Sequence, residues 1–340
     1  MIKSLLIAAV LSSLPVQPVA PAGFTAPAIT LPGIGDIRFT VTRRDRDGQA
    51  QLSLIYGEGS RRGNSSGPQP WAELVGLTLA DLDRTPPSPA VFRIERPAGV
   101  IACSGLAGGG EANGDCGFEA DAGYSRALVE RGLGTPEPRQ MFQLALQDFE
   151  LETLAELERQ GYARPELDDL VAAAIHNVDA AYVRGIADAG YRLGGLEDLI
   201  AFRIHDVTPE YIAAMAQLGD GFVRLPADQL LAMSIHGVTP EFAREMAALG
   251  YVGESPDQLV AMRIHRVTPQ FVRALAELGY RDLSSQSLIA FSIHGVTPDY
   301  IRQMKSAGHA DLSANQLVAL RIHGRTPGHR PARIRLQRAD

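Results

Sequence analysis

Six of the eight histidines in this chain recur at one position of a repeated pattern, each directly after an isoleucine. They are His176, His205, His236, His265, His294 and His323. Imidazole side chains can bind zinc, take up a proton at about pH 6.5, or bond the carbonyl groups that end a helix. A shared zinc ion requires ligand atoms about 2 Å away, whereas stacked helices lie about 8–10 Å apart. The spacing therefore favours a structural role at helix C-termini, with metal binding and pH sensing as the alternatives.

Arginines recur in register with the same pattern and form two columns. The first column is Arg184, Arg244, Arg273 and Arg302, and the second is Arg203, Arg263 and Arg321, with Ser234 and Ser292 between them. Glu241 lies three positions before Arg244, a spacing at which helical side chains form ion pairs. We interpret the columns as a solvated, internally paired face. The alternative is a polar stripe that engages an acidic partner, which makes these arginines the candidate binding residues of the chain.

The sequence lacks the motifs that we considered for metallopeptidases and for phosphate-binding loops. No HExxH motif is present, and Gly108-Gly109-Gly110 is not followed by GK[ST], so we expect a hairpin loop there. The acidic pairs Asp168-Asp169 and Glu197-Asp198 begin predicted helices, where carboxylates interact favourably with the helix dipole. The net charge of −7 argues against nucleic acid as a partner. We therefore expect neither an enzyme nor a bound cofactor.

Residues 37–137 have the patterning of a small β-rich domain. Two segments, Ile37–Thr42 and Gln51–Tyr56, alternate apolar and polar residues, as strands with one buried face do, and Val91–Glu95 and Val100–Cys103 form a second predicted strand pair. We expect an antiparallel sheet with residues 57–70 as a long exposed loop. A glycine-rich loop over Gly105–Asp115 should lead to a strand at Cys116–Ala120, and a helix should follow near Tyr124–Arg131.

Cys103 and Cys116 are the only two cysteines. An even number of cysteines in an exported protein predicts a disulfide, and neither residue belongs to a CxxC motif. The bond would tie two strands at the base of the glycine-rich loop. Because it closes a short loop, it would contribute about 3 kcal/mol through the unfolded state.

Residues 138–324 form a tandem array with a period of about 29 residues. After the histidine, Gly237–Pro240 supplies a glycine that ends one helix, a threonine that caps the next, and a proline in its first turn. Ser255–Gln258 has the form of a capping box and precedes a second, apolar helix that ends at His265. Two such helices cannot bury their apolar faces alone. We therefore predict an α-solenoid in which neighbouring repeats complete the core.

The two ends of the chain differ from the array. Residues 1–22, with Lys3, an apolar run and Ala20-Pro21-Ala22, predict a signal peptide, and residues 23–36 a linker. A degenerate first repeat begins near Leu146, as expected of a cap. Residues 325–340 form a basic tail. We expect no membrane span in the mature chain, because no other apolar run approaches about 20 residues.

The unit Ile235–Phe242, with Leu249-Gly250-Tyr251 and Leu259–His265, resembles the repeats of an uncharacterised family of bacterial exported proteins. Similar arrays are appended to membrane metallopeptidases of the β-lactam-sensor type, whose peptidase part is absent from this chain. The resemblance covers about residues 140 to 325. It implies a periplasmic interaction or sensing module and carries over no catalytic residue. Asn177–Asp179 and Arg325–Gly328 depart from the pattern, as weakened end repeats do.

These observations predict an α+β protein in which a small, disulfide-tied antiparallel domain precedes an α-solenoid. We expect a periplasmic or secreted scaffold that binds another envelope protein, of unknown identity, through one face of the array. The alternative is an envelope sensor of a ligand, pH or metal that uses the repeated histidines.

Overall fold

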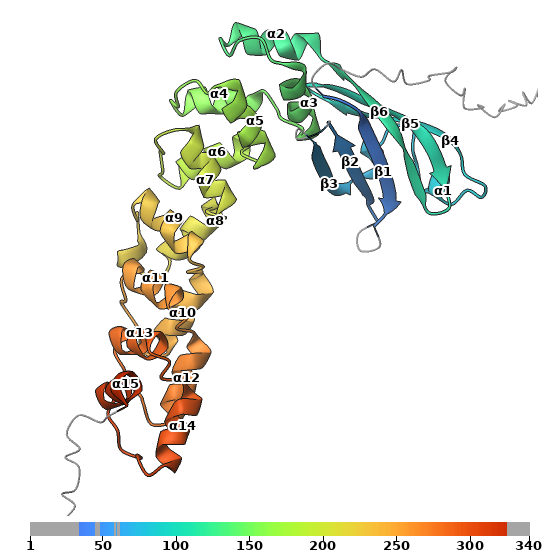
Figure 1. Ribbon diagram of the computed structural model, residues 1–340. Coiled ribbons are helices and arrows are strands. Elements are labelled where there is room, and N and C mark those ends of the chain that lie inside the picture. Colours follow the sequence, from blue (N-terminus) through green and yellow to red (C-terminus); the bar gives the residue numbers. More distant parts are fainter. Residues whose placement is uncertain (1–33, 45–47, 58, 60–61, 325–340) are drawn as a thin grey trace, which may run out of the picture. The chain divides into compact units, whose positions relative to one another are not determined.

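The computed structural model describes residues 34–44, 48–57, 59 and 62–324 (Figure 1). The predicted signal peptide, most of the predicted linker and the predicted basic tail lie outside these residues. The chain divides into two compact units. The first comprises the residues up to Ser125 together with Glu137–Ala145, and the second comprises Arg126–Pro136 and the residues from Leu146 onward.

The first unit contains a six-stranded antiparallel sheet in the order β3-β2-β1-β6-β5-β4 (Figure 1). Its strands are β1 (Ile37–Arg43), β2 (Ala50–Tyr56), β3 (Gly63–Gln69), β4 (Ser88–Arg96), β5 (Gly99–Gly108) and β6 (Glu111–Ala120). All four predicted strand segments lie within strands. In β1 the apolar side chains of Ile37, Phe39 and Val41 are buried and the residues between them are exposed.

Two predictions of loops are wrong. Residues 57–70 contain β3, which pairs along its whole length with β2. This strand has no buried residue, so it lacks the apolar alternation that would have indicated it. The predicted loop at Gly105–Asp115 is largely strand, because β5 continues to Gly108 and β6 begins at Glu111. Only Gly109 and Gly110 remain as the turn, both with positive φ.

The disulfide between Cys103 and Cys116 is present, as predicted. The two residues lie directly opposite each other on β5 and β6, with their Cα atoms 4.0 Å apart. The buried face of the sheet holds Phe39 and Phe92, whose rings meet edge to face at 4.9 Å. The bond and these rings stabilise the same side of the unit's core.

Four short helices accompany the sheet in sequence: η2 (Trp71–Glu73), α1 (Leu79–Leu82), α2 (Ala122–Glu130) and α3 (Pro138–Leu146). The predicted helix near Tyr124 is therefore confirmed as α2. In α3, the ring of Phe142 contacts Tyr56 of β2 at 5.1 Å and Phe118 of β6 at 5.4 Å. These aromatic contacts pack α3 against the sheet.

The second unit is a stack of six helix pairs (Figure 1). The first helices of the pairs are α4 (Glu152–Arg159), α6 (Ala180–Asp188), α8 (Pro209–Ala216), α10 (Pro240–Ala248), α12 (Pro269–Glu277) and α14 (Pro298–Ser306). The second helices are α5 (Leu167–Ile175), α7 (Leu196–Ile204), α9 (Ala227–Ile235), α11 (Pro256–Ile264), α13 (Ser285–Ile293) and α15 (Ala314–His323). Each even-numbered helix packs against its even-numbered neighbours, and the odd-numbered helices do so from α5 to α7 and from α9 to α15, so the repeats form two columns.

Local capping fixes where each first helix begins. In α8, α10, α12 and α14 a threonine hydroxyl accepts a hydrogen bond from the N–H group three residues later, and proline occupies the first turn. In the last of these, Thr297 caps Tyr300 at 3.2 Å. The residue after each repeat histidine adopts a left-handed conformation, even where it is Asn177, Asp206 or Arg266 rather than glycine. The predicted helix boundaries are thus confirmed.

The core of the stack is made by residues that recur once per repeat. The valine before each capping residue is at most 1% exposed: Val178, Val207, Val238, Val267 and Val296. Leu259 and Met262 of α11 show the pattern of the second helices, with exposures of 2% and 0%. Among the helices of the described residues, none combines the length and the hydropathy that a bilayer-spanning helix needs.

Candidate functional site

The second helices are apolar on two opposite sides. In α11, Leu259 and Met262 point into the stack, whereas Val260, Ala261 and Ile264 lie on the other side. Ile264 is 50% exposed, and Val260 and Ala261 are partly exposed. An amphipathic helix that packs on one side only would have polar residues at these positions. The outer side of α11 therefore has the composition of a surface that is covered.

The same arrangement occurs in the other repeats, except that Val171 of the first repeat is buried. We use the name isoleucine face for the isoleucines Ile175, Ile204, Ile235, Ile264, Ile293 and Ile322, the alanines three residues before them (Ala172, Ala201, Ala232, Ala261, Ala290 and Ala319) and the aliphatic residues four before them (Val171, Ile200, Leu231, Val260, Ile289 and Val318). The isoleucines are exposed by 44% in the first repeat to 54% in the fifth. Because the second helices pack on one another from α5 to α7 and from α9 to α15, these side chains follow one another along those parts of the array.

Helix propensity does not explain the isoleucines. Isoleucine is a weaker helix former than alanine, leucine, lysine or glutamate, and at half exposure it buries only part of its side chain. Single apolar residues on a surface are normal, but an exposed column at one position of every repeat is not. Contiguous apolar surface of this kind is typical of a protein-binding site. The sequence carried this signal, since isoleucine precedes every repeat histidine, but sequence reasoning concentrated on the histidines and arginines.

The second arginine column joins neighbouring repeats. Nε of Arg263 donates to the carbonyl of His236 in the preceding repeat at 3.4 Å, and its guanidinium lies 5.0 Å from the centre of the Phe242 ring. Arg321 makes the same two contacts, to the carbonyl of His294 and the ring of Tyr300. Arg203 contacts the ring of Tyr182 and bonds the carbonyl of Asn177, one residue after the repeat histidine. Ser234 and Ser292 replace the arginine in alternate repeats and donate to the carbonyls of His205 and His265.

Each arginine of the first column lies in an ion pair. Arg244 and Arg302 pair with acidic residues three positions before them, Glu241 and Asp299. Arg273 reaches Glu245 of the preceding repeat at 3.0 Å. These pairs are exposed, and exposed pairs contribute little to stability. The structure thus places a carboxylate beside each of the four guanidiniums. That these arginines bind an acidic partner stays a prediction.

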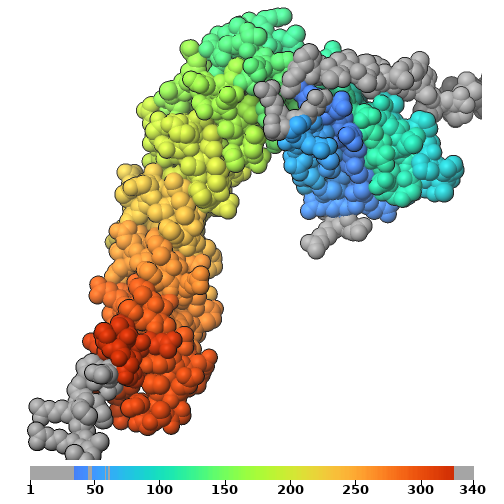
Figure 2. Space-filling model, viewed as in Figure 1, coloured from blue at the N-terminus to red at the C-terminus, as the bar shows by residue number. Residues whose placement is uncertain are grey.

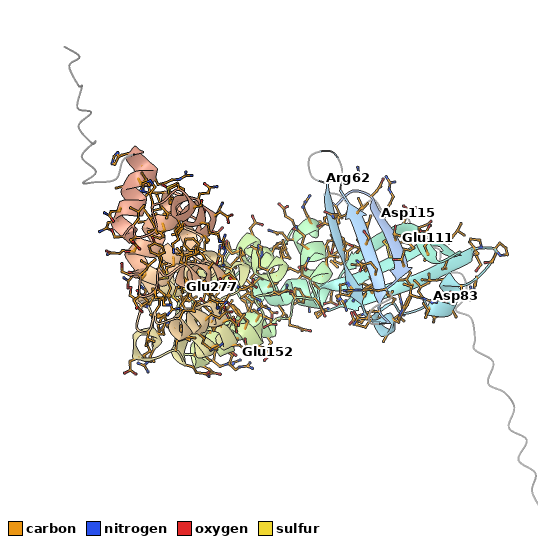
Figure 3. The ribbon with its side chains drawn as sticks, turned by 90° about the horizontal axis from the view of Figure 1, so that it is seen from below. Arg62, Asp83, Glu111, Asp115, Glu152 and Glu277 are labelled. Carbon is orange, nitrogen blue, oxygen red and sulfur yellow. A yellow bond between two sulfur atoms is a disulfide. The ribbon has the colours of Figure 1, made fainter. Side chains whose placement is uncertain are left out.

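Arg184, the remaining member of this column, takes part in a cluster around one buried carboxylate, that of Glu156. Its Nη2 atom lies 3.0 Å from Glu156 and 3.2 Å from Glu152, the latter labelled in Figure 3. The side chain of Glu156 is 1% exposed and also accepts hydrogen bonds from Gln160 and Arg159. The hydrogen bond from Gln160 and the two guanidiniums lower the pKa of Glu156 against the opposing effect of burial. The cluster therefore holds an ionised carboxylate between the first two repeats.

The histidines end the second helices through their backbone. The N–H of His265 bonds the carbonyl of Ala261, and its own carbonyl accepts the hydroxyl of Ser292. Within residues 62–324, none of the six imidazoles makes a hydrogen bond to a helix carbonyl, although we expected such bonds. No group of three or more His, Cys, Asp or Glu side chains in the described part of the chain is arranged to hold a metal ion.

One catalytic motif was overlooked in the sequence: Gly63–Gly67 has the form GxSxG. In α/β-hydrolases the serine of this motif occupies a sharp turn between a strand and a helix. Here Ser65 lies within β3, opposite Leu54 of β2, in extended backbone. The motif therefore lacks the geometry of a nucleophile elbow.

A comparison with known protein families and a comparison with curated proteins each found no match to this chain.

Proposed function

We propose that this chain is an exported, periplasmic or secreted scaffold whose helical array binds a protein of the cell envelope through the isoleucine face, without catalysis. One observation carries the proposal: six isoleucines at one position of the repeat are each about half exposed. Contiguous apolar surface that is rimmed by polar residues marks a site of interaction. The apolar strip is also bordered by polar and charged side chains, as the centres of protein interfaces are.

Two features support the exported location. The disulfide between Cys103 and Cys116 persists in oxidising compartments and is rare in the cytosol. The first 22 residues have the charged, apolar and small-residue segments of a signal peptide. Both are compatible with a protein that works in the envelope, where the resemblance of the repeats also locates it.

The test is capture of the partner from the periplasm by the tagged full-length protein after cross-linking. The informative variant is I204D/I264D, which adds two charges to the isoleucine face. Its matched control is Q270D/Q303D, which adds the same charges to exposed positions of α12 and α14. We expect the wild-type and control proteins to recover the same envelope protein and the isoleucine variant to lose it.

Two results would count against this proposal. Retention of the partner by I204D/I264D, with its loss on R244A/R273A, would move the site to the first arginine column. Recovery of no specific protein by any form would argue against a scaffold.

A further inference from the structure

We propose that the isoleucine face is covered by a second copy of this chain, with two arrays pairing face to face about a twofold axis along the stack of repeats. The inference rests on the proposed function, because it names the occupant of the same face. It is carried by the period of the face, its area, and the charges at its edges.

The period of the face calls for a partner with the same period. Each repeat offers one projecting isoleucine beside one alanine, and the alanine is identical in all six repeats. A partner that contacts the isoleucine and the alanine of every second helix must present one apolar ridge to each of these helices. Packed helices lie about 8–10 Å apart, so the ridges of the partner must have that spacing. The isoleucine face of a second copy is an apolar surface with that period. Closed pairs of this kind are the commonest assemblies of identical chains.

The twofold axis determines how the helices of the two copies meet. The second helices run across the stacking direction, so a half-turn about that direction reverses them. Each second helix therefore lies antiparallel against the same helix of the other copy. Ile264 then lies against Val260 and Ala261 of the second copy. The small alanine lets the two helices approach closely, because interaxial distance depends on the side chains at the contact.

The area of the face matches what a stable pair requires. Six isoleucines that are about half exposed present on the order of 500 Å² of apolar surface, and the aliphatic residues and alanines between them extend it towards the ~800 Å² per partner of a standard interface. A face of this size on a single chain would exceed the apolar patches that monomeric proteins usually expose.

The charges at the edges favour an antiparallel arrangement of the helices. Acidic residues occupy the first turns of α5, α7, α9 and α11: Asp168, Asp169, Glu197, Asp198, Asp228 and Asp257. The charged residues at or just after the opposite ends are mainly basic: Arg203, Arg263, Arg266 and Arg321, with Asp206 as the acidic exception. Antiparallel pairing puts Asp257 of α11 near Arg266 of the second copy, whereas parallel pairing would put like charges together.

Pairing in register sets opposite charges together at two of the six second helices. Helices α7 and α11 have an acidic first turn and an arginine in the last turn. Helices α5 and α9 have an acidic first turn and no basic residue in the last turn, and α13 has neither. The complementary charges therefore lie at α7 and α11.

The first experiment measures molar mass by light scattering and sedimentation at about 100 μM, well above a micromolar Kd. We expect twice the mass of one chain for the wild type and for Q270D/Q303D, and the mass of one chain for I204D/I264D with an unchanged circular dichroism spectrum. A monomeric wild type would overturn the second-copy proposal. A dimer that persists in I204D/I264D would overturn it too, because association would then use another surface.

The second experiment tests the register. Both native cysteines are in the disulfide, so an introduced cysteine reports only on the new position. Ala261→Cys, near the centre of the face, should form disulfide-linked dimers on mild oxidation. An equimolar mixture of tagged Ala232→Cys and untagged Ala290→Cys chains should form no mixed dimer, and mixed dimers would exclude pairing in register.

The outcomes separate this inference from the proposed function. If the wild type is monomeric but still captures another envelope protein through the isoleucine face, the scaffold remains and the second copy is excluded. If it is monomeric and captures nothing, both fail.

Discussion

Nη2 of Arg263 lies 2.8 Å from the position that a Cβ atom would take on Gly237, in the preceding repeat. Arg321 and Gly295 stand in the same relation, at 3.5 Å. Where serine replaces the arginine, the residue in the preceding repeat is larger: Asp206 precedes Ser234, and Arg266 precedes Ser292. At these four boundaries the arginine is present where the residue in the preceding repeat is glycine and is replaced by serine where that residue is larger. At the first boundary Arg203 is combined with Asn177, so the exchange of size does not extend to it.

This exchange predicts that Ser292→Arg destabilises the array alone but not together with Arg266→Gly. The new guanidinium would compete with Arg266 for the same space, and glycine would vacate it. We expect a coupling free energy of about 1 kcal/mol in a double-mutant cycle, measured by urea unfolding. Additive effects of the two substitutions would show that the positions are independent. Ser287→Arg in the first turn of the same helix is the control for adding an arginine.

Tyr211 predicts how stability depends on alkaline pH. Its hydroxyl donates to the carbonyl of Val238 in the next repeat at 2.9 Å, and burial raises its pKa to about 12. Between pH values of about 10 and 12 the unfolded chain loses this proton while the folded chain keeps it, so stability falls as pH rises. Tyr211→Phe should cost about 1 kcal/mol at pH 8, through the lost hydrogen bond, and less at pH 11.

The measurement for Tyr211 is the urea midpoint at several pH values. Tyr300→Phe is the control, because the hydroxyl of Tyr300 has no hydrogen-bond partner within residues 62–324. A constant difference between Tyr211→Phe and wild type from pH 8 to 11 would contradict the prediction.

Glu156 predicts the opposite dependence, at acid pH. Because the hydrogen bond from Gln160 and the neighbouring arginines lower its pKa, the carboxylate contributes stability above the unfolded value of about 4.5. That contribution is lost as pH falls through the folded value. Glu156→Gln should lower Tm by about 5 °C at pH 7 and by less at pH 3, measured by circular dichroism. The exposed Glu158→Gln is the control, and an equal loss at both pH values would show that Glu156 is not ionised in the folded chain.

Substitutions at Met262 and Ile264 of α11 should differ in their effect on the free energy of unfolding, because only Met262 lies in the core. Met262 is fully buried, so Met262→Ala should destabilise the chain by about 2–5 kcal/mol. Ile264→Thr changes a half-exposed side chain and should cost less than about 1 kcal/mol in the monomer. Urea unfolding at low protein concentration measures both. A large loss for Ile264→Thr would mean that the isoleucine supports the fold rather than a partner.

The sequence determined what depends on residues close together in the chain. Thr268 caps the N–H of Phe271 three positions later, and left-handed residues follow each histidine, so the helix boundaries and the period were predictable. Strand β1 was predictable because its alternation reflects one buried face. Strand β3 was not, since no side chain in it is buried and pairing with β2 alone makes it a strand.

The tertiary structure decided which side of each second helix faces the stack. Leu259 with Met262, and Val260 with Ile264, are apolar stripes of the same helix, and hydrophobicity does not choose between them. Which stripe is buried depends on residues about 29 positions away, in the neighbouring repeats, because those residues pack against only one of the two stripes. The role of Arg263 was decided in the same way, because its partner carbonyl on His236 and the ring of Phe242 come near it only after the repeats stack.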